Sequence, residues 1–454
     1  MITRRNGSEL LCLPDGPYQT LPSVDIPRWE RVAEQINNAV KAQLNVDAYS
    51  LFSCPCELQT NASRSTLFHV MEAIRPDGPV PPTTFWVPVS SLTGASFRDA
   101  DDFRMICVAL RSLSHRPESG SEGPFVKPGW LREVCTWVAR HIEPLNIRLT
   151  GNFRQLNASS SFSLIRFETT GPAVWFKAVG KPNSHEFNIV SILSALLPEY
   201  LPRIVAFRPE WNAWLMTEEE GTSPDADSDF SVWRAISARL GELQISSLHG
   251  IPRLMSAGCR DVRVSSLLKS TDDFFAMMDK FMKQQTKTPP SILTSKELSH
   301  LHEKINEYLR LLATTGIPDA LNHLDFNPGN IFVFGDRCTF IDWAEGAIGH
   351  PFLTFQYLLE HLTRLRPDHA SRHEELTFVY ASQWKRFASP SAVSRSLALA
   401  PLTAAFAYAV SSGAWRQPET LISPRVAGYF RGLVRRMKRE ADALDTRRFE
   451  CVPV

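Results

Sequence analysis

The chain has 454 residues, of which 43% are hydrophobic and 21% are charged, and its formal net charge is +1. This composition is typical of a globular protein with room for two or three domains. The near-zero charge argues against nucleic acid and anionic membranes as partners. No apolar segment follows the basic first residues, the eight cysteines are scattered, and the most apolar stretch, Leu397–Val410, contains Pro401 and is short for a membrane span. We therefore expect a cytoplasmic protein.

Residues 1–111 are predicted to form a separate small α/β module. Its expected elements are one helix and four strands, with the helix at 29–44 and the strands at 8–13, 48–52, 66–73 and 83–87. This mixture resembles the Nudix hydrolase fold, whose helix binds magnesium through the glutamates of an Arg-Glu-x-x-Glu-Glu pattern. The stretch Asn38–Gln43 of the expected helix has no carboxylate. The resemblance therefore implies a degenerate module that lacks the family's metal chemistry.

Residues 112–144 are predicted to be a linker that ends in a helix. The segment 112–129 is rich in proline and glycine, which is typical of a connection between domains. Apolar residues then recur at helical spacing over 130–142. This helix is expected to dock the front module onto the next domain.

The next region is predicted to begin with strands at 148–155, 162–168 and 173–179. The third strand holds Lys177 among apolar residues, where a charge is costly unless it is paired. Glu186, at the start of a helix predicted at 184–197, is the expected partner. The small-residue stretch Leu156–Ser161 between the first two strands is either a simple hairpin turn or a loop whose backbone N–H groups cover phosphates.

A fourth strand is predicted at 212–216, and an acidic run from Glu218 to Asp229 follows it. This run is interpreted as a solvated surface, with an attractive field for a cationic ligand as the alternative. The rest of the chain is predicted to be mainly helical, with helices at 230–248, 262–283, 295–313 and 352–365 and further helices to about residue 444.

One late stretch holds two carboxylates and an amide at fixed spacing. Asp325 lies in a polar turn, and Asn330 follows five residues later. The apolar segments 331–334 and 339–341 flank a Gly-Asp turn and predict a β-hairpin with Asp342 at its end. In phosphoryl-transfer enzymes one aspartate orients the acceptor hydroxyl, while an asparagine and a second aspartate hold magnesium on the nucleotide phosphates.

The pattern His323-x-Asp325-x-x-x-x-Asn330, followed by Ile341-Asp342-Trp343, resembles the catalytic core of the aminoglycoside phosphotransferase and choline kinase families. These families share the protein-kinase-like fold. The resemblance implies an α+β fold, with a two-lobed kinase-like domain that follows the front module. Its first lobe would span 145–219, and its helix-rich second lobe would span 220–445.

The motif departs from the family pattern at two positions. The families commonly have His-Gly-Asp-Leu-His-Pro-Gly-Asn here, whereas this chain has Leu324 for the glycine and Asn327 for the second histidine. Neither change removes a metal ligand or the base. Asn327 does put in doubt any role that belongs to the second histidine.

The resemblance implies a role for each matching residue. Asp325 would be catalytic, and Asn330 and Asp342 would hold Mg²⁺. Lys177, aligned by Glu186, would neutralise the phosphates of ATP or GTP. The other residues expected to bind the nucleotide belong to the small-residue loop and to the connector between the lobes, namely Asn157, Ser159, Ser160, Met216 and Glu218.

Three residues near the motifs have more than one interpretation. Lys181, in the turn before Pro182, is the alternative phosphate ligand to Lys177, which the strand context favours. His323 either braces the loop or transfers a proton, and bracing is favoured because Asp325 already fills the base role. Glu345 could line the cleft, pair with a base or contact the acceptor.

The expected function is ATP- or GTP-dependent phosphorylation of a hydroxyl group on a small molecule. The resemblance points first to an antibiotic of the aminoglycoside type, and the alternative is a metabolite kinase of the choline or homoserine type. A non-catalytic nucleotide-binding scaffold is the alternative from a different class. The joint presence of Asp325, Asn330 and Asp342 argues against the scaffold. Nothing in the sequence determines the oligomeric state.

Overall fold

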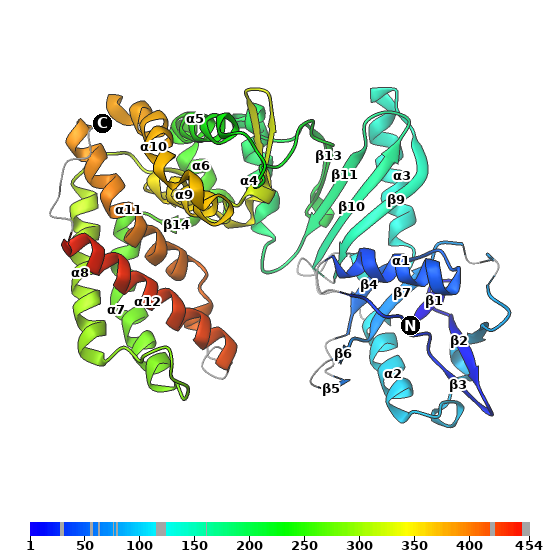
Figure 1. Ribbon diagram of the computed structural model, residues 1–454. Coiled ribbons are helices and arrows are strands. Elements are labelled where there is room, and N and C mark those ends of the chain that lie inside the picture. Colours follow the sequence, from blue (N-terminus) through cyan, green and yellow to red (C-terminus); the bar gives the residue numbers. More distant parts are fainter. Residues whose placement is uncertain are drawn as a thin grey trace. The chain divides into compact units, whose positions relative to one another are not determined.

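The structure is a computed structural model that describes residues 1–27, 31–54, 58–61, 64–75, 77–78, 80–114, 124–159, 161–417 and 423–446. The chain forms two compact units (Figure 1). The first unit consists of Met1–Phe187 and Arg203–Glu218, and the second consists of Asn188–Pro202 and the residues from Glu219 onward. The division at Glu218 lies beside the predicted end of the first kinase-like lobe. The predicted boundary after residue 111 falls inside the first unit.

The N-terminal part of the first unit is a six-stranded sheet with the order β3-β2-β1-β7-β4, and β8 also pairs with β2. Only β1 and β7 are parallel neighbours. The strands are β1 (Ile2–Arg4), β2 (Glu9–Asp15), β3 (Tyr18–Thr20), β4 (Ala48–Ser53), β7 (His69–Ala73) and β8 (Phe85–Pro88), and β5 (Leu58–Asn61) and β6 (Arg64–Thr66) form a separate ribbon. The helices are α1 (Val32–Leu44), α2 (Ala100–Ser114) and α3 (Trp130–Ile142).

The predicted helix and strands of this part are confirmed to within a few residues, but α2 was missed. Its buried residues Met105, Ile106 and Ala109 follow helical spacing, so the signal was present in the sequence. Strands β1 and β3 have three residues each and are too short to show a period. Helix α1 is acidic only at Glu34, which forms an ion pair with Arg154.

The second sheet of the first unit is antiparallel and has the order β12-β13-β11-β10-β9. Its strands are β9 (Leu149–Ala158), β10 (Phe162–Thr169), β11 (Val174–Val179), β12 (Ile204–Arg208) and β13 (Ala213–Thr217), and helix α4 (His185–Leu196) follows β11. Four of these strands were predicted. Edge strand β12 was not, because all of its residues are half-buried and none of the alternation that marks a strand is visible.

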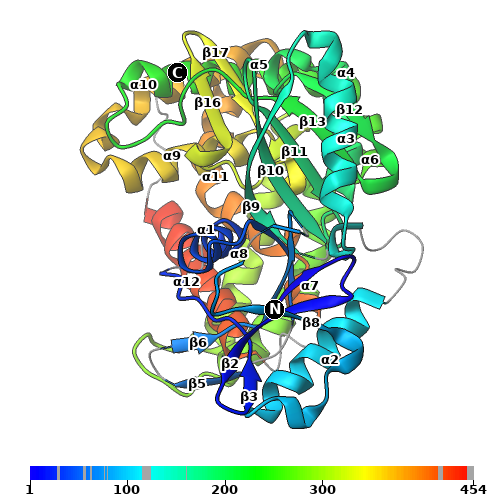
Figure 2. The same ribbon diagram turned by 90° about the vertical axis from the view of Figure 1, so that its right-hand side faces the viewer.

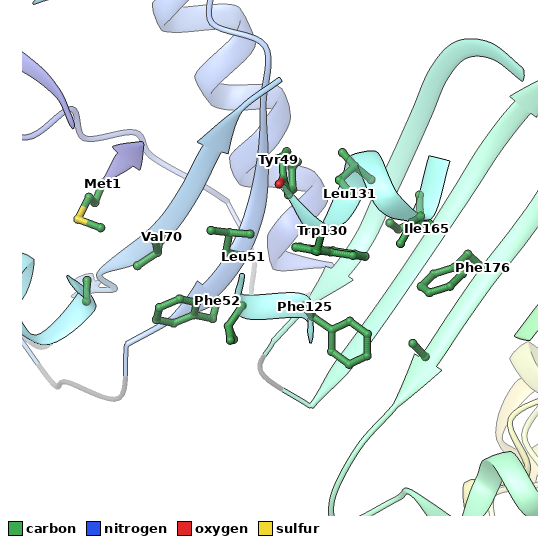
Figure 3. Close-up of a cluster of buried hydrophobic side chains, with 14 of the residues drawn as sticks. Met1, Tyr49, Leu51, Phe52, Val70, Phe125, Trp130, Leu131, Ile165 and Phe176 are labelled. Atoms are coloured by element: carbon green, nitrogen blue, oxygen red, sulfur yellow. The ribbon is translucent and has the colours of Figure 1, made fainter. Parts of the chain in front are cut away.

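One hydrophobic core joins the two sheets of the first unit (Figure 3). The Trp130 ring of α3 lies 6.2 Å from the Tyr49 ring of β4 and 6.5 Å from the Phe176 ring of β11, measured between centroids. Leu51 and Val70 on one side and Ile165 on the other belong to the same buried cluster. The predicted docking helix therefore lies inside a continuous core, which explains why no unit boundary occurs near residue 111.

The second unit is rich in helices, as predicted. They are α5 (Phe230–Ser247), α6 (Ile251–Ala257), α7 (Val264–Lys283), α8 (Ser295–Ala313), α9 (Phe352–Leu365), α10 (His373–Ser382), α11 (Pro390–Ser411) and α12 (Pro424–Thr446). Helices α7, α8, α11 and α12 contact one another as a bundle (Figure 1). By length and composition α11 could cross a membrane, but 67% of its most apolar window is buried, and α11 packs against α9 and α12 as a core helix.

Two small sheets within the second unit carry the motif residues. The first has the order β14-β18-β15, built from β14 (Arg260–Val262), β18 (Gly346–Gly349) and β15 (Ala320–His323). The second is the predicted hairpin of β16 (Ile331–Phe334) and β17 (Arg337–Phe340), in which Ile331 pairs with Phe340. Strand β17 packs against α5 (Figure 2). This arrangement places Asp325 after β15, Asn330 before β16 and Asp342 after β17.

Candidate active site

Asp325 and Asn330 are in direct contact in the loop after β15. The Asn330 side-chain amide donates from Nδ2 to Oδ2 of Asp325 at 3.1 Å and to the backbone oxygen of Asp325 at 2.9 Å. The Asn327 amide donates to the other carboxylate oxygen, Oδ1, at 2.9 Å. Two amides thus hold the Asp325 carboxylate, which stays exposed to solvent.

These hydrogen bonds also orient Asn330. Because its Nδ2 donates to a carboxylate and a carbonyl, its Oδ1 is the end left to accept or to bind a cation. Asn327 accepts the Gly329 N–H at 2.9 Å, which shapes the Asn-Pro-Gly turn between Asp325 and Asn330. Asn327 was left without a role in the sequence analysis, although this turn signal could have revealed it.

Asp342 lies next to Asn330 through the backbone. The Ile341 N–H donates to the Asn330 carbonyl at 3.0 Å, which extends the pairing of the hairpin by one residue. Asp342 follows with φ 65° and ψ 60°, a left-handed conformation that is uncommon for residues other than glycine. Such strain is characteristic of functional sites. The three predicted residues Asp325, Asn330 and Asp342 therefore meet at one place in the second unit.

His323 connects the segments around Asp325 and Asp342 through hydrogen bonds, and its ring is neutral. Its ring donates from Nε2 to the Ile341 carbonyl at 2.9 Å, and its backbone N–H donates to the Thr354 hydroxyl at 2.9 Å. The side chain packs 4.8 Å from the Trp343 ring and is only 2% exposed. Burial lowers the pKa of His323, so the ring is neutral at pH 7. Bracing rather than proton transfer is the role that this geometry supports.

The segment that follows the division between the units is fastened to the hairpin. Thr222 and Val333 exchange two backbone hydrogen bonds of 3.0 and 3.2 Å, and the Thr339 hydroxyl donates to the Glu219 carboxylate at 3.0 Å. Gly221 makes this approach possible. It has φ +110°, and a Cβ atom there would lie 2.4 Å from the Val333 oxygen.

In the first unit, Lys177 and Glu186 form the predicted ion pair. The distance from Nζ to Oε1 is 2.6 Å, and the two residues are 7% and 1% exposed. Nζ also lies 5.5 Å from the Trp214 ring centroid, within the range of a cation–π interaction. Lys181, the alternative phosphate ligand, is exposed. A desolvated ammonium held by a carboxylate is the arrangement that kinase-like enzymes use for nucleotide phosphates.

Two of the other residues predicted to bind the nucleotide, Asn157 and Met216, lie on the same sheet. Asn157, Leu164, Lys177 and Trp214 are neighbours in register across four strands, and neighbouring residues project from the same face. Met216 is on this face as well, because it pairs with Trp175, two residues before Lys177. The opposite face carries Phe176 into the shared core of Figure 3.

Ser159 and Glu218 already have partners in the first unit. The Ser159 N–H donates to the Phe162 carbonyl at 2.8 Å and its Oγ accepts the Ser161 N–H at 3.2 Å, so its hydroxyl shapes the hairpin turn. Ser160 lies outside the described residues. Glu218 accepts two hydrogen bonds from Arg166, at 2.6 and 2.8 Å, and this pairing holds the pKa of Glu218 below its ordinary value. Arg166 was not singled out from the sequence, since it is 52 residues from Glu218.

The donor set in the second unit suits magnesium. Mg²⁺ prefers oxygen ligands and usually binds through one or two protein groups together with phosphates and water. The Asn330 Oδ1 and the Asp342 carboxylate supply such a pair. Within the described part of the chain, no group of three or more His, Cys, Asp or Glu side chains that could hold a metal occurs.

Comparison with a family model shows what part of the chain is similar to known proteins. Residues 182–379 match the model of the phosphotransferase enzyme family. The match includes Glu186, Asp325, Asn330 and Asp342 and confirms the predicted family resemblance. Together with the five-stranded antiparallel sheet and the helix-rich second unit, it supports the predicted kinase-like α+β fold. The match begins after the front module, so the predicted Nudix-like module is not confirmed.

Several solved structures are similar to this chain. A choline kinase from Cryptosporidium parvum Iowa II has 13% identity, with 71% of this chain and 98% of that chain covered and a TM-score of 0.48. A macrolide 2'-phosphotransferase from Brachybacterium faecium has 16% identity, with 64% and 96% covered and a TM-score of 0.41. A choline/ethanolamine kinase family protein from Mesorhizobium loti has 17% identity, with 66% and 94% covered and a TM-score of 0.40. Among curated proteins no match was found.

Proposed function

We propose that the protein transfers the γ-phosphoryl group of ATP or GTP to a hydroxyl group of a small molecule, with Mg²⁺ as cofactor. The observation that carries this proposal is the contact of Asn330 with Asp325 on one side and with the residue before Asp342 on the other. Three oxygen-bearing side chains with different chemical tasks thereby share one loop and one hairpin. The family match over residues 182–379 supports the same reaction class.

Each residue has one task in the proposed mechanism. Asp325 orients the acceptor hydroxyl and accepts its proton, for which its exposed carboxylate, held by two amides, is suited. Asn330 and Asp342 would hold magnesium, which would neutralise charge on the transferred phosphoryl group. Lys177, kept in place by Glu186, neutralises the other phosphates. Because the transition state of phosphoryl transfer is loose, positioning and electrostatic stabilisation supply most of the rate enhancement.

The proposal is tested by magnesium-dependent consumption of ATP and GTP in the presence of a panel of hydroxylated acceptors. We expect Asp342→Ala to abolish consumption while the melting temperature stays close to that of the wild type. Asp336→Ala is the matched control, because Asp336 is an exposed carboxylate at the tip of the same hairpin. Near-normal turnover of the Asp342 variant would contradict the proposed magnesium site.

The same assay separates an enzyme from a scaffold. An enzyme consumes nucleotide with at least one acceptor, whereas a scaffold binds nucleotide and consumes none with any acceptor. Mass spectrometry of the product then shows whether an antibiotic or a metabolite received the phosphoryl group. Nucleotide binding without consumption would overturn the proposed reaction and leave the fold assignment intact.

A further inference from the structure

The second unit contains a cavity of about 370 Å³ that the proposed mechanism does not yet use. This volume is at the small end of the range for ligand pockets. Its charged and aromatic lining comes from four elements and consists of Arg260, Glu345, Tyr408, Arg425, Tyr429 and Phe430. Apart from β14 and the turn after Asp342, this lining belongs to α11 and α12.

The cavity is joined to the catalytic loop through Glu345. The Leu324 N–H, one residue before Asp325, donates to the Glu345 backbone oxygen at 3.1 Å. Glu345 is also the last residue of the short 3-10 helix Trp343–Glu345, which Asp342 precedes as the N-cap residue. A molecule in the cavity would therefore contact Glu345, whose backbone is joined to the segments that contain Asp325 and Asp342.

The charges around the cavity favour an anion. Glu345 lies 3.5 Å from Arg260, so its charge is already partly balanced. Arg425 is exposed at the cavity wall and pairs with no carboxylate among the residues that the structure describes. Its positive charge is therefore the one left for a ligand. The lining has two guanidinium groups and one carboxylate, so its net positive charge attracts a carboxylate or phosphate and repels an ammonium group.

Nearby carboxylates do not reverse this balance. Glu360, on the neighbouring helix α9, forms ion pairs with Arg436 and Arg364. The acidic run Glu218–Asp229 contributes no residue to the lining of the cavity. The attractive field for a cation, considered as an alternative from the sequence, stays a prediction.

We propose that this cavity holds the acceptor and that the acceptor is a small hydroxylated anion. Its carboxylate or phosphate would pair with Arg425, and its apolar part would lie against Tyr429 and Phe430. This inference rests on the proposed phosphotransferase function. In the reaction the acceptor hydroxyl gives its proton to Asp325, its oxygen forms a bond to the γ-phosphorus, and the bond to the β-phosphate oxygen breaks, which yields a phosphomonoester and a nucleoside diphosphate.

The first test measures binding by calorimetry, with probes that differ mainly in charge. The aromatic probes are 4-(hydroxymethyl)benzoate and its neutral amide, the phosphate probe is glycerol 3-phosphate with glycerol as its neutral counterpart, and choline and kanamycin are the cationic probes. We expect an anionic probe to bind more tightly than its neutral counterpart and the cationic probes to bind weakest. The carboxylate and phosphate pairs show which anion the site prefers. Anionic probes that bind no better than the neutral ones would overturn the inference.

Variants make the test specific to the cavity. Arg425→Gln should weaken anion binding roughly ten- to hundredfold, the contribution of one charge-assisted hydrogen bond. Arg439→Gln is the matched control, because Arg439 is exposed on the same helix about 20 Å away at 1.5 Å rise per residue, and it should change nothing. Glu345→Gln should strengthen binding of the anion, whereas a site for a cation would lose affinity. Unchanged anion binding in Arg425→Gln would contradict the inference.

Turnover separates this inference from the proposed function. With a phosphorylated anionic acceptor, Arg425→Gln should raise KM far more than it lowers kcat, because Arg425 contacts the acceptor away from the reacting oxygen. Efficient phosphorylation of choline or kanamycin, with a KM that Arg425→Gln leaves unchanged, would overturn the anionic acceptor and keep the kinase. Anion binding that depends on Arg425, with no nucleotide consumed, would overturn the kinase and keep the anion site.

Discussion

The charged groups of interest are buried in the first unit and exposed in the second. In the first unit, Lys177 and Glu186 are buried together at 2.6 Å. In the second unit, Asp325 is exposed, and its carboxylate accepts hydrogen bonds from the nearby side chains of Asn327 and Asn330. A buried charge needs its partner for stability, whereas an exposed carboxylate keeps its hydration. A change in the buried pair is therefore expected to alter both activity and stability, whereas a change at Asp325 is expected to alter activity alone.

The largest expected effect is on turnover and sharpens this contrast. Asp325→Asn keeps the shape of the side chain but removes the proton acceptor, so kcat should fall by about 10²–10⁴-fold. Because Asp325 is exposed, the free energy of unfolding should change little. Turnover is measured with the acceptor found in the panel, and unfolding with urea. A large loss of unfolding free energy in Asp325→Asn would contradict the expectation that this residue affects activity alone.

The buried pair should behave differently. Glu186→Ala leaves the Lys177 ammonium without its carboxylate and should lower the free energy of unfolding by about 3–5 kcal/mol. The double variant Lys177→Met/Glu186→Leu removes both charges and should stay close to the wild type in stability while losing activity. Urea unfolding of the wild type, the single variant and the double variant decides this. Equal destabilisation by the single and double variants would show that packing, and not charge, determines the contribution of these two residues to stability.

A backbone change beside the active site should have a smaller effect. Gly221→Ala adds a Cβ atom 2.4 Å from the Val333 oxygen at φ +110°, so it should cost about 1–3 kcal/mol of stability. Gly432→Ala is the control of opposite sign, because Gly432 lies in α12 with no atom near its added Cβ and alanine favours a helix by about 0.5–1 kcal/mol. Both values come from urea midpoints. A stabilising Gly221→Ala would rule out the close approach of this segment to the hairpin.

The last expected effect is the dependence of stability on pH. Burial lowers the pKa of His350 to about 3 and also lowers the pKa of His323. Each imidazole is neutral in the folded protein and binds a proton near pH 6.5 when unfolded, so its contribution is present above pH 6.5 and is lost as the pH falls below it. Each should contribute up to about 1.4 kcal/mol per pH unit. Urea unfolding between pH 7.5 and 5 measures the slope, which His350→Gln should flatten.

Local signals carried the prediction of the catalytic loop. Asp325, Asn327 and Asn330 lie within six residues, and their hydrogen bonds join residues two or five apart in the chain. The hairpin that follows depends on one turn and two short apolar strands. Such short-range features can be recognised from residue types and spacing alone. The pairing of Lys177 with Glu186, nine residues apart, is another short-range feature.

Other features were decided by contacts between distant parts of the chain. Trp130 joins Tyr49 to Phe176 in a single core, so the predicted separation of the front module at residue 111 did not appear as a unit boundary. The cavity with Arg260, Glu345 and Arg425 combines residues that are at least 80 positions apart. A linear pattern shows that each residue is charged but does not show which charges meet in space. The motif alone therefore indicated the proposed reaction class, and only the packing of β14, α11 and α12 around Glu345 supplied the charge balance on which the proposed acceptor class rests.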